Sequence, residues 1–131
     1  MLQFDVKKTV QYWFEGAEYD MSVTDAMYRT GKYPYALFIG HLALEKILKA
    51  MVVKTTQKHA PYTHSLTLLA SELRFKIPQK TMKKLARFME FHFEARYPDE
   101  QKKFYQKCTK EFTKEKLQEI REVFAWLKEK L

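Results

Sequence analysis

The feature that most constrains the fold is the segment 36–53, which is apolar almost throughout. Placed on a helix, its apolar side chains cover nearly the whole circumference, and a helix that is apolar all round is buried. The segment carries too much charge for a membrane span, so we interpret it as the core helix of a soluble protein. The polar residues that interrupt it are His41, Glu45, Lys46 and Lys49.

Three of these polar residues form a stripe on the helix. His41, Glu45 and Lys49 lie four residues apart, so each is rotated by roughly 40° from the last. Buried charges are costly unless they are paired. The stripe therefore predicts a partner, a groove or an interface. The alternative is a solvated row of i, i+4 pairs, which stabilise a helix by only about 0.2–0.5 kcal/mol each.

The composition indicates one helical domain with an anionic partner. The chain has 131 residues, of which 46% are hydrophobic, and this suits a single domain with a sizeable core. It contains 3 Gly and 4 Pro, few enough to favour long helices. The net charge of +8 favours nucleic acid, a nucleotide or an acidic protein as partner. A lysine-rich surface that only aids solubility is an equal alternative.

The sequence also bears on the cellular setting. The single cysteine, Cys108, excludes an internal disulfide and suits a reducing compartment. The first residues lack the apolar core of a signal peptide. We therefore expect a cytoplasmic protein that does not bind a membrane.

Helix boundaries are marked by a few turn residues. Gly31 ends the first helix as a C′ glycine, and Pro34 lies in the first turn of the second. Thr63 or Ser65 caps a short third helix. The predicted fold is an all-α, antiparallel (up-and-down) bundle of four to five helices that forms one domain over residues 1–131. The expected helical segments are 5–29, 33–55, a short piece near 66–73, 79–97, a short piece over 99–107, and 113–131.

The fourth of these segments carries candidate functional residues. His92 and Arg96 lie one turn apart on its apolar stripe and could meet a common anion. The alternative is structural, with the histidine bonded to a backbone carbonyl and the arginine paired with an acid. Arg87 and His92 form an Arg-x-x-x-x-His pattern. This spacing turns a straight helix by roughly 140°, so the two side chains meet only at a helix irregularity or across a dimer interface.

Other ligand classes receive less support. His59 and His64 flank the loop around Pro61, but the chain has no HxxxH or HExxH set, so we expect no metal site and no cofactor. Most phenylalanines follow helical spacing and belong to the core. Tyrosines near helix ends are better candidates for contacts with a ligand or a base, and they are Tyr33, Tyr35, Tyr62 and Tyr97.

Several segments, taken in order, resemble the HEPN family, named for higher eukaryotes and prokaryotes nucleotide-binding. The most recognisable is His41–Ala50, which is similar to the family pattern Ala-x-Glu-Lys-x-Leu-Lys-Ala. The resemblance extends over residues 10–127. The other matching segments are 13–20, 31–36, 63–66 and 95–99.

The resemblance implies an all-helical bundle that forms homodimers and acts beside a minimal nucleotidyltransferase as a toxin–antitoxin pair. Many family members are metal-independent ribonucleases. Their Arg-x(4–6)-His motif, matched here by Arg87 and His92, lies in a cleft between protomers. In that role a cation stabilises developing phosphate charge and a histidine, which titrates near neutrality, transfers protons.

Three functional hypotheses follow. The first is a module that binds a nucleotide or RNA and a nucleotidyltransferase partner. The second is an endoribonuclease toxin with Arg87 and His92 as catalytic residues, although Phe88 and Glu94 replace the polar residue and the tyrosine usual around this motif. The third is a noncatalytic helical assembly partner. The ligand-binding residues predicted for the first are Glu45, Lys49, His64, Arg96 and Tyr97, with His92 beside them.

Overall fold

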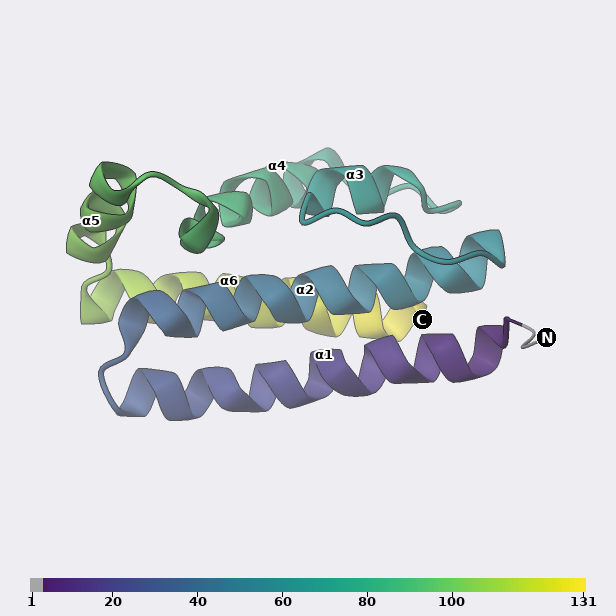
Figure 1. The fold of residues 1–131 in the computed structure, drawn as a ribbon, viewed down its shortest axis with the longest axis horizontal. Helices are drawn as coiled ribbons and strands as arrows, with labels where there is room; N and C mark the ends of the chain where they lie inside the picture. The colour runs from purple at the N-terminus through teal and green to yellow at the C-terminus, as the bar shows by residue number, and fades with distance from the viewer. Residues whose placement is uncertain (1–3) are drawn as a thin grey trace.

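The computed structural model describes residues 4–131, and in this part of the chain helices are joined by short turns without any strand (Figure 1). The prediction of an all-α helical bundle is confirmed. None of the described helices is long and apolar enough to cross a membrane. The elements are α1 (Val6–Arg29), α2 (Tyr33–Thr56), α3 (Leu66–Ser71), α4 (Gln79–Phe88), the 3-10 turns η1 (Met89–Phe91) and η2 (Phe93–Ala95), α5 (Pro98–Lys107) and α6 (Lys110–Lys130).

The turn between α1 and α2 is a Schellman motif, as the glycine predicts. Gly31 adopts a left-handed φ of 76°. Its N–H donates to the Tyr28 carbonyl at 3.1 Å, and the Lys32 N–H donates to the Met27 carbonyl at 2.8 Å. These bonds satisfy carbonyls that the end of a helix leaves unpaired. The motif turns the chain so that α2 packs antiparallel to α1 (Figure 1).

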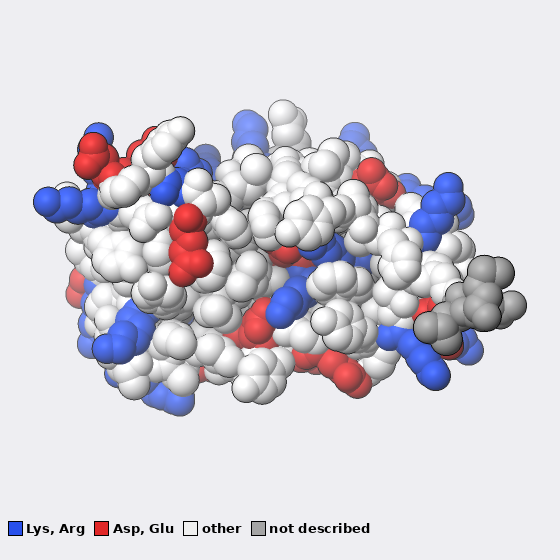
Figure 2. Space-filling view, viewed as in Figure 1, with Lys and Arg blue, Asp and Glu red and all other residues white. Residues whose placement is uncertain are grey.

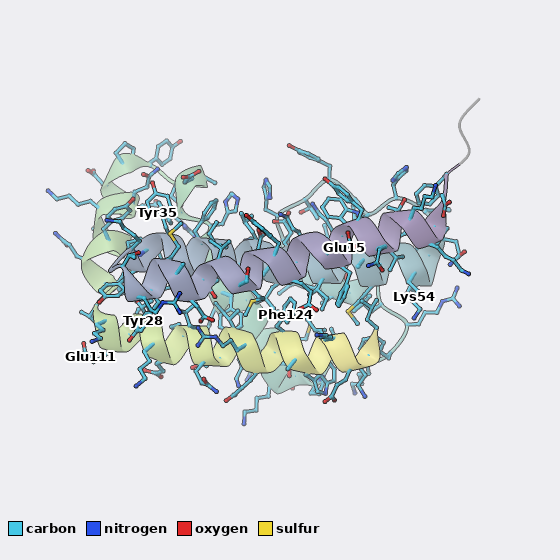
Figure 3. All side chains as sticks on the ribbon, turned by 90° about the horizontal axis from the view of Figure 1, so that it is seen from below. Glu15, Tyr28, Tyr35, Lys54, Glu111 and Phe124 are labelled. Atoms are coloured by element: carbon cyan, nitrogen blue, oxygen red, sulfur yellow. The ribbon has the colours of Figure 1, made fainter. Side chains whose placement is uncertain are left out.

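The second helix is the central element of the bundle. α2 contacts α1 on one side, α6 on another and α3 on a third, and Figure 1 shows it running through the middle of the molecule. Leu37, Leu44 and Leu48 on α2 are fully buried. Seen from the α1 side, Phe124 of α6 lies between α6 and α1 (Figure 3). The predicted burial of the apolar helix is confirmed.

The prediction of one continuous helix over 79–97 is wrong. α4 ends at Phe88, and η1 and η2 follow with a break at His92, where φ is −81° and ψ is 61°. Phe91 and Phe93 are both buried, at 2% and 1% exposure. Residues two apart point to opposite sides of a helix, since they are rotated by about 200°. A continuous helix would therefore leave one of these rings in solvent.

The last helix begins earlier than its apolar spacing indicates. Thr109 is the N-cap of α6, and its side chain accepts a hydrogen bond from the Phe112 N–H at 3.1 Å. The expected start at Thr113 is wrong because a capped helix can begin with a polar, exposed turn. α5 closes the end of the bundle and lies across its long axis (Figure 1), so this helix is not part of the up-and-down packing.

Gly40 allows the closest approach of α2 to α6. A Cβ atom at Gly40 would lie 2.9 Å from Cδ1 of Ile120. We expect Gly40→Val to lower the free energy of unfolding by about 1–3 kcal/mol, because branched atoms would overpack this contact. Urea denaturation measures the change. Gly16→Ala is the control, since its Cβ would meet only the flexible Lys46 side chain, at 3.2 Å. Equal stability of Gly40→Val and wild type would contradict the packing argument.

Candidate functional site

The polar stripe of α2 forms a buried charge network. Lys49 Nζ donates to Glu45 Oε2 at 3.0 Å, and both side chains are more than nine-tenths buried. The other carboxylate oxygen, Oε1, lies 2.9 Å from His64 Nδ1 in the loop after α2. Lys49 Nζ also lies over the Trp13 ring of α1, 5.0 Å from its centroid. Both oxygens of the buried carboxylate are therefore paired, as burial of a charge requires.

Three histidines gather beside this network, and we call His41, His64 and His92 the histidine cluster. The rings of His64 and His92 are stacked, with centroids 4.4 Å apart and an interplanar angle of 26°. The His41 and His92 rings meet edge to face at 5.2 Å. The backbone break at His92 is what directs this side chain toward α2. The cluster thus joins α2, the loop after it and the η1–η2 junction.

The members of the cluster differ in exposure. His41 is fully buried, whereas the His64 side chain is 52% exposed and His92 is partly exposed. Burial is the main cause that lowers the pKa of His41 to about 4; the carboxylate of Glu45 opposes this shift, and the other two histidines add to it. Burial, followed by the proximity of His64, also lowers the pKa of His92. Both rings are therefore neutral near pH 7.

His41 is also notable for its missing hydrogen bonds. Among the described residues neither ring nitrogen has a close, well-aligned hydrogen-bond partner, although the backbone of His64 lies nearby and raises the pKa of His41. Buried polar atoms are nearly always paired, so an unpaired one calls for an explanation, such as a catalytic role or a bound water or ion. His41 therefore keeps hydrogen-bonding capacity that is not fully used at the base of the cluster.

The contact of Glu45 with His64 determines which hydrogen bonds the exposed His64 ring can make with a ligand. A carboxylate beside Nδ1 favours the tautomer with its proton on that atom, which leaves Nε2 as an acceptor. The stacked rings also present an aromatic surface with a fixed orientation. Across residues 4–131, no group of three or more His, Cys, Asp or Glu side chains is arranged to hold a metal ion. The arrangement suits stacking and hydrogen bonding with an aromatic ligand.

The structure brings four of the predicted residues together and separates the others. Glu45, Lys49, His64 and His92 belong to one network. Arg96 instead extends into solvent and pairs with Glu100 of α5 at 3.4 Å, so the expected stripe shared by His92 and Arg96 does not exist. The helix break at His92 is the reason.

The remaining predicted residues lie elsewhere on the surface. Tyr97 precedes α5 and is 80% exposed. Arg87 is exposed on α4 and lines a hollow of about 300 Å³ with Lys107 of α5 and Lys116 of α6. That hollow contains no member of the histidine cluster. Within one chain, Arg87 and His92 thus face different surroundings.

His41 of the histidine cluster and Trp13, which lies under Lys49, were not among the predicted site residues. The four-residue spacing from His41 to Glu45 and Lys49 was a signal that the histidine faces the same region. The contact between Trp13 and Lys49 had no comparable signal, because it depends on how α1 packs on α2.

The comparison with protein families decides the classification. A model of the HEPN domain matches residues 10–131. The chain belongs to the HEPN family. The solved structures include one similar to this HEPN chain, the crystal structure of TT1696 from Thermus thermophilus, with a TM-score of 0.78 and 21% sequence identity over 93% of this chain and 98% of that one. At this identity the likeness concerns the fold. Among curated proteins there is no match.

The buried ion pair provides a stability test. We expect Glu45→Leu to lower the free energy of unfolding by about 3–5 kcal/mol, because it leaves the Lys49 ammonium buried without its carboxylate. The double variant Glu45→Leu/Lys49→Met removes both charges and should recover most of the loss. Denaturant unfolding of both variants and wild type measures these changes. A double variant less stable than the single would show that the pair is not the reason for the loss.

A second test uses the titration of His41. Its pKa is about 4 in the folded chain, against 6.5 when unfolded, so the unfolded state binds more protons between these values. Stability should therefore fall as the pH is lowered from 6.5 to 4, by up to about 3 kcal/mol from this residue. His41→Leu should flatten that dependence, while the lowered pKa of His92 leaves a smaller slope of the same sign. Unfolding curves at several pH values measure it, and identical slopes would refute the assignment.

Proposed function

We propose that this HEPN protein binds a nucleotide or single-stranded RNA at the histidine cluster, and that it acts with a minimal nucleotidyltransferase as a toxin–antitoxin pair. The observation that carries the binding proposal is the stacked pair of His64 and His92, in which His64 is half exposed and is held by Glu45 at Nδ1. The nucleotidyltransferase partner and the toxin–antitoxin role rest on the resemblance to the family.

The chemistry of the site matches that of a nucleobase. Bases stack on aromatic side chains, histidine included, and this contact tolerates any sequence because every base has a π-face. The carboxylate of Glu45 is balanced by Lys49, so the site does not present a free negative charge to a phosphate. The net charge of +8 adds a long-range attraction for nucleic acid.

We also propose a homodimer. The side of α2 that carries Phe38, Ile39 and Leu42 is apolar and only partly buried, and Tyr35 at its start is 40% exposed. Apolar surface of this kind suits contact with a second copy of the chain. With its single thiol, Cys108, unpaired, the protein suits a reducing, cytoplasmic setting.

Endoribonuclease activity through Arg87 and His92 has less support. The two side chains belong to different surroundings within one chain. A catalytic pair would need Arg87 from a second copy to approach His92. The proposal of binding requires no such rearrangement, and for this reason it is preferred.

Binding measurements test the proposal. We expect His64→Ala to weaken the binding of ATP or a short RNA by at least about fivefold, because removal of one stacking ring costs about 1–3 kcal/mol. Arg96→Ala is the matched control: this side chain is exposed and pairs with Glu100 outside the cluster, so affinity should stay within about twofold, a change small beside the loss of a stacked ring. Isothermal titration calorimetry compares the two. Unchanged affinity in His64→Ala, or an equal loss in Arg96→Ala, would remove the cluster as the binding site.

A further inference from the structure

An exposed aromatic pair on α1 lies apart from the histidine cluster. The rings of Tyr12 and Trp13 meet edge to face, with centroids 5.3 Å apart. Tyr12 is 69% exposed, so its ring is open to solvent beside the partly buried Trp13. Two hollows share this pair as a common wall: one of about 300 Å³ toward Lys8 and His59, and one of about 280 Å³ toward Lys46.

The two hollows differ in charge. Lys8 and His59 line the first, and no acidic side chain lines it. In the second, Lys46 is paired with Asp20 at 2.8 Å, and Glu15 stands at the rim. A phosphate is therefore attracted to the first hollow and not to the second. The second offers instead an aromatic wall with polar groups that suit the edge of a base.

A glycine keeps the second hollow open. Gly16 lines it, and a Cβ atom there would lie 3.2 Å from Cδ of Lys46, closer than ordinary van der Waals contact. Glu15, the neighbouring residue, marks this region near the middle of α1 (Figure 3). Figure 2 shows the face formed by α1, α2 and the following loop, where a broad uncharged area surrounds a small group of lysine and acidic side chains.

The aromatic pair is connected to the histidine cluster by direct contacts. Trp13 lies under Lys49 Nζ, which binds Glu45, which in turn binds His64. A ligand with one aromatic group reaches only one end of this series. A chain of nucleotides has several bases at regular intervals and a phosphate between each two, so it presents a base to each end of this series.

We propose that Tyr12 and Trp13 form a second base-stacking subsite, and that the ligand is a single-stranded nucleic acid of several nucleotides. Its base stacks on Tyr12, and the adjacent phosphate contacts Lys8 and His59. This inference rests on the proposed function, since it takes the histidine cluster as the first subsite. An acidic peptide would use the basic hollow but would gain nothing from the aromatic wall, so the observations favour nucleic acid.

The experiment measures affinity against ligand length. Fluorescence anisotropy gives the affinities of uridine monophosphate, by competition, and of labelled octauridylate for wild type and variants. We expect octauridylate to bind more tightly than the monophosphate. Tyr12→Ala should weaken octauridylate binding by roughly 5- to 150-fold, the range for loss of one stacked base, and leave the monophosphate unaffected. Tyr12→Phe, which keeps the ring, should retain most of the affinity.

Tyr19→Ala is the matched control, because Tyr19 is also exposed on α1, at 71%, but lines neither hollow. Equal losses in Tyr12→Ala and Tyr19→Ala, or no gain from added length, would overturn the second subsite while leaving the histidine site intact. Insensitivity of monophosphate binding to His64→Ala would instead contradict the proposed function. Displacement of octauridylate by a polyglutamate peptide, with Tyr12→Ala unchanged, would assign the surface to an acidic protein and also overturn the inference.

A second readout is independent of the label. In a Trp126→Phe background, Trp13 is the remaining tryptophan, and a base in contact with it should quench its fluorescence. Quenching by octauridylate and not by the monophosphate is expected. Equal quenching by both would contradict the length dependence.

Discussion

Glu45 and Lys49 bring opposite charges into the central, largely buried helix of the bundle. Burial of either charge alone is strongly unfavourable, so the two must remain in contact, and the second carboxylate oxygen must find a further partner. His64 is that partner, and this contact ties the loop after α2 to the core. Trp13 covers the ammonium from the other side and so ties α1 to the same point. The candidate site is thus a consequence of how the fold accommodates one buried pair.

The helix break at His92 completes the arrangement. Three phenylalanines close together in the sequence, Phe88, Phe91 and Phe93, are all buried, and no straight helix can direct all of them inward. The backbone changes direction to bury them, and His92 is left facing the histidines of α2 and the loop. The demand for apolar burial therefore places a polar ring at the site. It also separates His92 from Arg96.

These features together give the surface its functional character. Stacked imidazole rings beside the compensated Glu45–Lys49 pair offer aromatic area at the site, whereas the chain as a whole carries a net charge of +8. This division suits a ligand with apolar bases and a charged backbone. The Tyr12–Trp13 pair repeats the same combination on α1, with Lys8 and His59 beside it.

The sequence by itself determined the all-α class, the central position of α2, the turn at Gly31 and the need of its charged stripe for a partner, because each depends on local periodicity, backbone preference or the cost of burying charge. It also allowed recognition of the HEPN family. Only the tertiary structure decided which distant residues complete the site. Helical spacing along 79–97 placed His92 with Arg96, but burial of Phe91 and Phe93 outweighed that spacing. The contact of Trp13 with Lys49 depends on the packing of two helices, which no local pattern encodes.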